Sequence, residues 1–314
     1  MDYLKSQSSS STSSKDDTLN LPRILCLHGG GTNARIFRAQ CRSLSRALEE
    51  PRHFRLAYAE APYPSGAGPD VLTVYASEGP FKRWLPWLPE HATAGHPNAS
   101  ASAVKGDDAA AVRDIDNALK RAMDADDRAG ATGPWVGIIG FSQGAKLAAS
   151  LLYRQQQRLQ RREQKQTTEN PHEVVDANND DDDGGNIYNG WKFIVAMAGR
   201  APIVDLEPHI LFTQKSLFLA RPTQIELGPL PDKKKTLDAD DSHVLRLPSI
   251  HVHGLRDPGL HLHQALLDRY TDRGSSLTRL IQWDGGHRVV LKSTDVEPVV
   301  NAILQVARRV GVEV

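Results

Sequence analysis

The chain has 314 residues, enough for a single α/β domain with insertions, and its 38 basic residues balance its 38 acidic ones. A net charge of zero gives no overall field that would attract nucleic acid or an anionic membrane surface, so we expect neither as a partner. Two cysteines, Cys26 and Cys41, are too few for a disulfide framework and favour a reducing compartment.

Residues 1–20 are rich in serine and contain no apolar run. This composition is typical of a disordered tail and differs from that of a secretory signal. No later segment has the length and apolar character of a transmembrane helix. We therefore expect one domain over residues 21–314 and a cytoplasmic location.

Six short apolar runs have the character of buried strands, and helical patterns separate them. Apolar strands that alternate with helices predict a mostly parallel sheet with helices on both faces, an α/β fold. The predicted strands are residues 24–27, 54–59, 135–140, 193–198, 249–253 and 278–282. The predicted helices are residues 33–48, 107–127, 142–160, 260–270 and 295–310, with Thr294 and Glu297 spaced as a capping box before the last one.

Three stretches interrupt this alternation. Residues 62–106 are rich in proline, glycine and aromatic side chains, so they are a candidate lid or pocket wall. Residues 155–190 and 222–247 are polar and highly charged, and we expect them to be solvated surface insertions. The aromatic residues of the first stretch are candidate substrate contacts: Tyr63, Phe81 and Trp84.

The segment Gly140-Phe141-Ser142-Gln143-Gly144 matches the motif G-x-S-x-G. It follows the predicted strand of residues 135–140 directly and opens a predicted helix, as a nucleophile elbow does. Such a turn places the serine oxygen above the sheet edge, with the positive end of a helix dipole behind it. Ser142 is therefore the candidate nucleophile, although an ordinary glycine-rich turn could have the same letters.

A serine nucleophile needs a base, and in hydrolases with this elbow an acid and then a histidine follow the serine along the chain. His287 lies in a late loop after a strand, beside two glycines that permit a sharp turn. Asp257 lies four residues past the strand of residues 249–253 and is the candidate acid that would orient the imidazole. Asp205 and Asp284 remain alternatives to it.

The loop after the first predicted strand reads His28-Gly29-Gly30-Gly31, an HGGG-type loop. Acyl hydrolysis passes through a tetrahedral anion, which needs N–H donors held in place beforehand. One donor is expected from this loop and one from the residue after the nucleophile. We predict the amides of Gly30 and Gln143, with Gly31 as the alternative in the loop.

Two other kinds of site fit parts of the sequence. The glycine loop with Glu60 after the next strand is also similar to a dinucleotide-binding unit, but that interpretation gives Ser142 and His287 no role. His251 and His253 alternate on one predicted strand and could share a metal ion. A buried strand presents neither side freely, however, and no H-E-x-x-H or C-x-x-C motif accompanies them. We expect no metal and no cofactor.

Together these motifs resemble the fungal serine hydrolase (FSH) family of α/β-hydrolases, over about residues 21–310. Its relatives include the ovarian-cancer-associated hydrolase and the thioesterase that releases the lovastatin polyketide. The resemblance implies an α/β-hydrolase fold, a triad of Ser142, Asp257 and His287, and an oxyanion hole. The segments that carry it are residues 24–29 with Asn33, 140–145, 253–257 and 285–287.

The resemblance also implies cleavage of a carboxylic ester or thioester through an acyl-serine intermediate. The substrate class that it suggests is a polyketide acyl chain on the carrier domain of a synthase, in fungal secondary metabolism. A general short-chain carboxylesterase, an acyltransferase and a non-catalytic ligand-binding protein on the same scaffold remain alternatives.

Overall fold

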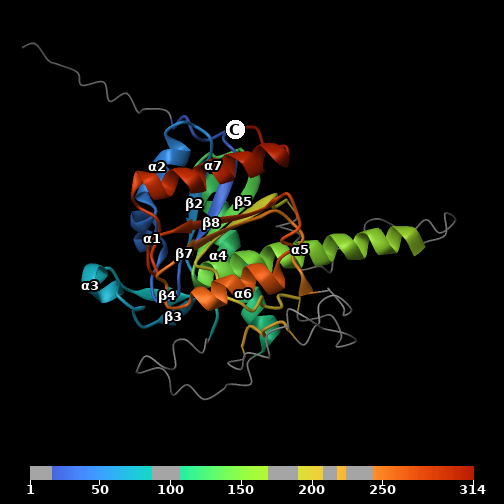
Figure 1. Ribbon diagram of the computed structural model, residues 1–314, viewed down its shortest axis with the longest axis horizontal. Coiled ribbons are helices and arrows are strands. Elements are labelled where there is room, and N and C mark those ends of the chain that lie inside the picture. The colour runs from blue at the N-terminus through green and yellow to red at the C-terminus, as the bar shows by residue number, and fades with distance from the viewer. Residues whose placement is uncertain (1–15, 87–106, 169–189, 208–217, 224–242) are drawn as a thin grey trace, which may run out of the picture.

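The computed structural model describes residues 16–86, 107–168, 190–207, 218–223 and 243–314. Its centre is a sheet of parallel strands in the order β2-β1-β5-β6-β7-β8 (Figure 1). Each of the predicted strands is present, within one or two residues of its predicted ends. They are β1 (Arg23–Leu27), β2 (Arg55–Ala59), β5 (Trp135–Phe141), β6 (Phe193–Met197), β7 (Ser249–Gly254) and β8 (Thr278–Trp283).

Helices cover both faces of this sheet, which confirms the predicted α/β architecture. In Figure 1, α2 and α7 lie above the sheet, and α5 and α6 lie below it. No helix within the described ranges is both long and apolar enough to cross a membrane. One face carries α1 (Ala34–Gln40), α2 (Arg42–Glu49) and α7 (Ser293–Arg309), and the other carries α4 (Asp108–Arg128), α5 (Gln143–Thr168) and α6 (Leu260–Tyr270).

The first strand shows why these segments are apolar throughout. Successive side chains of a strand point to opposite faces of the sheet. Leu25 and Leu27 pack with α4, α5 and α6, whereas Ile24 and Cys26 pack with α1, α2 and α7. Since both faces are covered, every residue of β1 is buried.

The predicted helices differ from the observed ones in their ends. The helix predicted for residues 33–48 is broken at Cys41, which ends α1 and precedes α2. Helix α7 begins at Ser293 after Lys292, which makes no side-chain capping bond, so the predicted capping box is wrong. Helix α5 continues to Thr168, well past its predicted end.

Two polar stretches were predicted as surface insertions. The first residues of the stretch 155–190 and the last residues of the stretch 222–247 instead pack within the fold. Gln155 on α5 is buried, and its side chain donates to the carbonyl of Trp191 at 2.8 Å and accepts from the Trp191 N–H at 3.0 Å. The amide of Gln156 bonds in the same way to the backbone of the segment 243–247. These polar side chains therefore provide hydrogen-bond partners for buried backbone groups. Residues 169–189 and 224–242 of these stretches lie outside the described residues.

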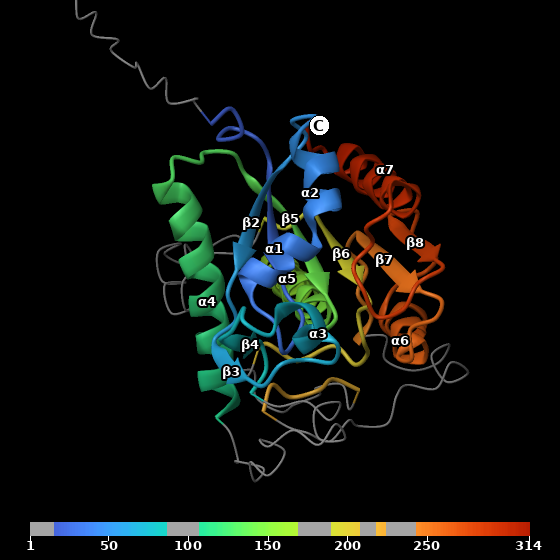
Figure 2. The same ribbon diagram turned by 90° about the vertical axis from the view of Figure 1, so that its left-hand side faces the viewer.

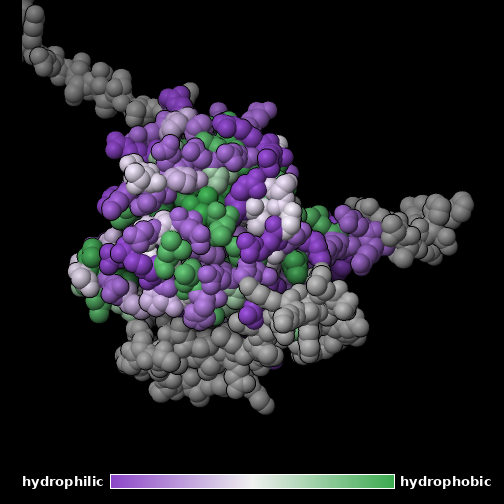
Figure 3. Space-filling model, viewed as in Figure 1, coloured by the Kyte–Doolittle hydropathy of each residue, from purple (hydrophilic) through white to green (hydrophobic). Residues whose placement is uncertain are grey.

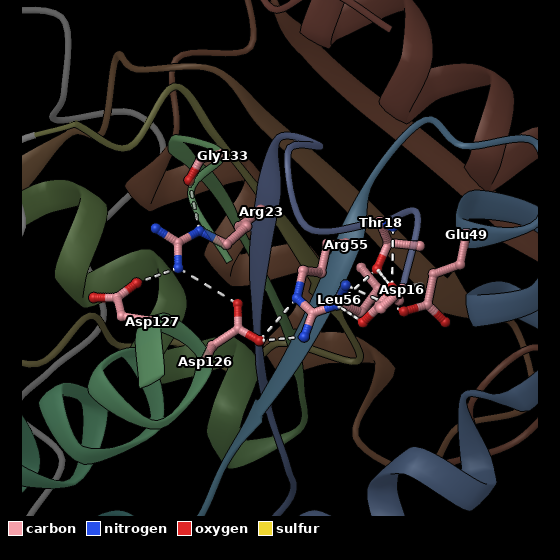
Figure 4. Close-up of polar contacts among 9 residues, drawn as sticks. All are labelled: Asp16, Thr18, Arg23, Glu49, Arg55, Leu56, Asp126, Asp127 and Gly133. Atoms are coloured by element: carbon pink, nitrogen blue, oxygen red, sulfur yellow. Dashed lines mark hydrogen bonds and ion pairs between the residues drawn. The ribbon is translucent and has the colours of Figure 1, made fainter. Parts of the chain in front are cut away.

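The chain before β1 is tied to the amino ends of β1 and β2 (Figure 4). Asp126 at the end of α4 accepts from Arg55 at 2.8 Å and from Arg23 at 3.4 Å, the first residues of the two strands. Arg55 also pairs with Asp16 at 2.8 Å. Residues 16–20 of the predicted tail therefore belong to the described fold, and residues 1–15 lie outside the described residues.

A small second sheet and a short helix follow β2. Strands β3 (Tyr63–Ser65) and β4 (Phe81–Arg83) form an antiparallel ribbon, with α3 (Val71–Tyr75) between them. Figure 2 shows α3 and this ribbon at the end of the main sheet to which the strand arrows point. In an open α/β sheet the ligand site lies at this end, outside the carboxyl ends of the strands.

Candidate active site

Ser142 stands on the tight turn between β5 and α5. Its φ of 54° is in the left-handed region, and its N–H donates to the carbonyl of Met197 at 2.9 Å. The turn is so close that only glycine fits on either side of it. A Cβ at Gly140 would lie 2.3 Å from the Gly144 carbonyl oxygen, and one at Gly144 would lie 2.1 Å from that of Leu27. The motif glycines are therefore required by backbone approach, as in a nucleophile elbow.

The structure brings the predicted serine, histidine and acid together in one hydrogen-bonded series. Nε2 of His287 lies 3.0 Å from Oγ of Ser142, and Nδ1 of the same ring lies 2.7 Å from Oδ2 of Asp257. The ring of Phe141 packs against the imidazole, with the two centroids 4.9 Å apart. This is the arrangement of a serine hydrolase triad.

The acid and the histidine are held by two loops that bond to each other. Asp257 follows β7 and His287 follows β8, and these strands are neighbours in the sheet. The N–H of Arg256 donates to the Gly285 carbonyl at 2.9 Å, which fixes one loop against the other. Residues 145 positions apart in the sequence, Ser142 and His287, are thereby placed in contact.

Asp257 is ionised in this setting. Burial raises the pKa of Asp257, but the hydrogen bond and charge of His287 and the N–H of Gly259 outweigh it, so the pKa falls to about 2. A carboxylate only accepts hydrogen bonds, so Nδ1 of His287 carries the proton. Nε2 is then left as an acceptor facing the hydroxyl of Ser142, which is the state required of a general base.

The alternative acids have other partners. Asp284 is exposed and pairs with Arg256, Oδ1 to Nε, at 2.9 Å. Asp205 accepts the N–H of Glu207 at 2.9 Å. The imidazole contact belongs to Asp257, so the geometry favours Asp257 over both.

Ser142 and His287 lie in the wall of a cavity of about 460 Å³. Helix α3 supplies one side of it, and residues 287–291 supply another. Three cationic side chains also line it: Arg42, Arg200 and Arg288.

The family model described as serine hydrolase (FSH1) matches residues 18–299. The chain belongs to this family. The serine hydrolase is 46% identical over 300 residues to the esterase pigG of Monascus ruber, with 96% of each chain covered. It is 44% identical over 297 residues to an esterase of Pestalotiopsis microspora, covering 95% of this chain and 96% of the relative. A carboxylesterase structure from Bacillus cereus aligns with 93% of this chain and 91% of that chain, with a TM-score of 0.45 and 14% identity.

The dinucleotide interpretation is thereby wrong, and Glu60 of the serine hydrolase has a different partner set. Its carboxylate lies 3.3 Å from the N–H nitrogen of Ala34 and 3.3 Å from Nε2 of His28. These contacts join the first residue of α1 to the start of the glycine loop. Glu60 therefore supports the loop beside the nucleophile.

Both residues of the serine hydrolase whose amides were predicted to form an oxyanion hole lie in the wall of the same cavity as Ser142. Gly30 and Gln143 both line it. The amide of Gly31, the alternative donor, already donates to the Lys82 carbonyl at 2.9 Å. Within the described residues, the N–H groups of Gly30 and Gln143 donate to no such backbone carbonyl. The geometry therefore favours these two amides.

None of the three aromatic residues predicted as substrate contacts is among the described residues that line the cavity. Tyr63 donates its hydroxyl to Asp114 at 2.9 Å. Trp84 is fully buried, and its indole N–H donates to the His28 carbonyl at 2.9 Å. Phe81 belongs to the β3–β4 ribbon. Residues 87–106 of the predicted lid lie outside the described residues.

Part of the wall comes from α3, which lies within residues 62–106, the stretch predicted as a lid or pocket wall, although no helix was predicted there. Val71, Thr73, Val74 and Tyr75 line the cavity. The only signal in the sequence was a run of five residues, too short to distinguish a helix from a strand.

Potential metal ligands meet at the triad and not at the histidine pair considered from the sequence. Within the described ranges, Asp257, His263 and His287 offer ligand atoms that all lie within 4.8 Å of one another. The Asp257–His287 separation of 2.7 Å is that of a hydrogen bond. Ligands of a tetrahedral zinc ion lie about 3.3 Å apart, given its bond lengths of about 2.0–2.1 Å. The arrangement therefore fits a proton relay better than a metal site.

Proposed function

We propose that this serine hydrolase cleaves carboxylic esters and thioesters through an acyl-Ser142 intermediate. The observation that carries the proposal is the hydrogen-bonded series from Ser142 through His287 to Asp257, open to one cavity. Its relatives at 46% and 44% identity are named esterases, which supports the same chemistry here.

The acylation step follows from this geometry. Nε2 of His287 removes the hydroxyl proton as Oγ of Ser142 bonds to the carbonyl carbon. The carbonyl oxygen becomes an anion, which the amides of Gly30 and Gln143 stabilise at the start of α5. The bond to the leaving oxygen or sulfur then breaks, and His287 returns the proton to the leaving group.

Deacylation repeats the cycle with water. His287 accepts a proton from water while the water oxygen bonds to the acyl carbon, and collapse of the second anion releases the carboxylic acid. The proton returns to Oγ of Ser142. Asp257 remains ionised throughout and stabilises the imidazolium in both halves.

The substrate class that we propose is a polyketide acyl chain held as a thioester on a carrier domain. Apolar side chains such as Val74 and Leu291 line the cavity and suit an acyl chain. Figure 3 shows hydrophobic surface at the position of α3, where Leu72 and Val74 are 60% and 70% exposed. Arg42 and Arg288 are exposed and line the same cavity. A guanidinium group binds phosphate well, and a phosphopantetheine arm contains a phosphate group.

Labelling with a fluorophosphonate probe tests the nucleophile. We expect stoichiometric modification of the folded protein at Ser142, mapped by peptide mass spectrometry, and none in Ser142→Ala. Unlabelled wild-type protein would instead support a non-catalytic binding protein on this scaffold. Thermal unfolding of both proteins shows that the comparison is made between folded chains.

The thioester part is tested with paired substrates that carry the same acyl group. We expect hydrolysis of both the acyl-phosphopantetheine thioester and the phosphate-free acyl-N-acetylcysteamine thioester. Arg288→Gln should lower kcat/KM about fivefold for the first alone, because an exposed charge-assisted contact contributes about 1 kcal/mol. Arg279→Gln, on the edge strand β8, is the matched control.

Release from the synthase separates the substrate proposal from the chemistry. A loaded synthase should liberate more free acid with the wild-type enzyme than with Ser142→Ala. Equal release in both, together with hydrolysis of simple oxygen esters, would reject the polyketide role and leave an esterase. Transfer of the acyl group to an added alcohol or amine in preference to water would identify an acyltransferase.

A further inference from the structure

The carboxylate of Asp257 faces three nitrogen groups, of which the triad uses one. Oδ1 accepts the N–H of Gly259 at 2.8 Å, and Oδ2 accepts Nδ1–H of His287 at 2.7 Å. Nε2 of His263, on α6, lies 3.6 Å from the same Oδ2. The side chains of Asp257 and His263 are both 0% exposed, so water does not compete for this approach.

His263 has no other polar contact that explains it. Neither of its ring nitrogens has a hydrogen-bond partner within the described residues. Burial lowers the pKa of His263 to about 3, although the charge of Asp257 acts in the opposite direction. The ring is therefore neutral near pH 7 and has a single N–H, and the adjacent carboxylate favours that proton on Nε2.

We propose that His263 is a positioning residue, whose Nε2–H holds the Asp257 carboxylate in the orientation that His287 needs. A separation of 3.6 Å is just outside hydrogen-bond range. Catalytic hydrogen bonds are often long in an empty site and tighten as the reaction proceeds. A shift of a few tenths of an ångström closes this one when His287 takes up the proton of Ser142.

A neutral donor suits this position better than a cation. A lysine or arginine beside Oδ2 would compete with the imidazolium of His287 for the carboxylate. A neutral N–H restricts rotation of the carboxylate and adds no charge that competes with the imidazolium. The next ring along, His253, is neutral as well, because burial lowers its pKa to about 4; its ring centroid lies 5.6 Å from that of His263.

Two substitutions of similar size separate positioning from packing. His263→Gln retains an amide N–H close to the place of Nε2, whereas His263→Met fills the space without a donor. We expect His263→Met to lower kcat for a chromogenic ester about tenfold, the effect of one lost charge-assisted hydrogen bond. KM should stay within about twofold, because His263 is absent from the described residues that line the cavity. His263→Gln should retain kcat within about threefold.

Thermal stability separates positioning from a structural role, because replacing a residue with a structural role would lower the thermal midpoint. His263→Met removes a buried, unpaired polar group, so its thermal midpoint should equal or exceed that of the wild type. Lower kcat with unchanged or higher stability is the signature of positioning. Titration with the fluorophosphonate probe normalises each kcat to the folded, reactive fraction.

The inference rests on the proposed roles of Ser142, His287 and Asp257. It is overturned if His263→Met keeps the wild-type kcat, or if the Gln and Met variants lose kcat equally. A parallel rise in KM would also overturn it, since that marks distortion of the cavity. Failure of the proposed function looks different, because the wild-type protein would then neither react with the fluorophosphonate probe at Ser142 nor hydrolyse the ester.

Discussion

The carboxylate of Asp257 connects the nucleophile to the fold, because it fixes which nitrogen of His287 carries the proton. An amide at this position can accept one hydrogen bond from the ring but can also donate one, which permits the wrong tautomer. We therefore expect Asp257→Asn to fold normally and to lower kcat for ester hydrolysis by about 10³- to 10⁴-fold.

The alternative acids are matched controls for this substitution. Asp205→Asn and Asp284→Asn should leave kcat within about twofold, since their carboxylates contact Glu207 and Arg256 and not the imidazole. The measurement is initial-rate hydrolysis of a chromogenic ester at one pH, with circular dichroism to compare folding. A large loss in Asp205→Asn with little in Asp257→Asn would reassign the acid.

The roles of residues that belong to a sequence motif could be predicted from the sequence. The roles of residues that depend on tertiary packing could not. Ser142 and His287 follow from the elbow and from the chain order of the triad. His263 has no such signal, because a histidine on an amphipathic helix resembles any other buried polar residue until the fold places it at Asp257. Trp84 shows the reverse error, since an aromatic residue near the site is buried beneath the glycine loop.

At the scale of elements, burial decided what the sequence could predict. The strands of the main sheet are covered on both faces, so their apolar runs are unambiguous. Helix α3 is short, and its N-cap Asp70 has a left-handed φ of 60° and makes no side-chain capping bond. A backbone bond from Gly68 to the Gly31 carbonyl at 2.9 Å holds this segment against the glycine loop. Its conformation depends on tertiary contacts that no local pattern encodes.

Helix α3 should set the preference for acyl chain length. Val74 lines the cavity, whereas Leu72, on the same helix and similarly exposed, does not. Val74→Ser removes apolar surface worth about 1 kcal/mol to a bound chain, so KM for a medium-chain ester should rise about fivefold. KM for the acetyl ester should be unchanged, because its acyl group is too short to reach the wall.

Leu72→Ser is the control for helix stability and surface polarity. It should leave KM for both esters at the wild-type value, as measured by steady-state kinetics on a series of acyl lengths. Equal changes in the two variants would show that α3 acts as a unit and that Val74 has no specific contact. Unchanged KM in both would place the acyl chain elsewhere in the cavity.

In the whole molecule, a line of neutral histidines runs from β7 to α6 on the face of the sheet that α6 covers. The rings of His251 and His253 are 6.2 Å apart, and those of His253 and His263 are 5.6 Å apart, between centroids. Burial lowers their pKa values from 6.5 to about 3, 4 and 3, in the order His251, His253 and His263. The sequence predicted the first two as buried residues of a strand, but not that α6 would extend the line to the triad.

These histidines make the fold sensitive to acid. Between pH 6.5 and about pH 4 the unfolded chain binds protons at all three positions and the folded chain does not, so stability rises with pH in this window. Each histidine contributes a slope of about 1.4 kcal/mol per pH unit, or about 4 kcal/mol for three. Asp257, with its pKa lowered to about 2, adds a further loss only below about pH 4.

Urea unfolding at intervals from pH 7.5 to pH 4.5 measures this slope. His253→Gln should reduce it by about 1.4 kcal/mol per pH unit, because one of the three proton-binding differences is removed. His261→Gln, which replaces an exposed ring on α6, is the control and should retain the wild-type slope. A slope that His253→Gln leaves unchanged would mean that the buried ring is already protonated in the folded state, in which case loss of stability in acid arises elsewhere in the fold.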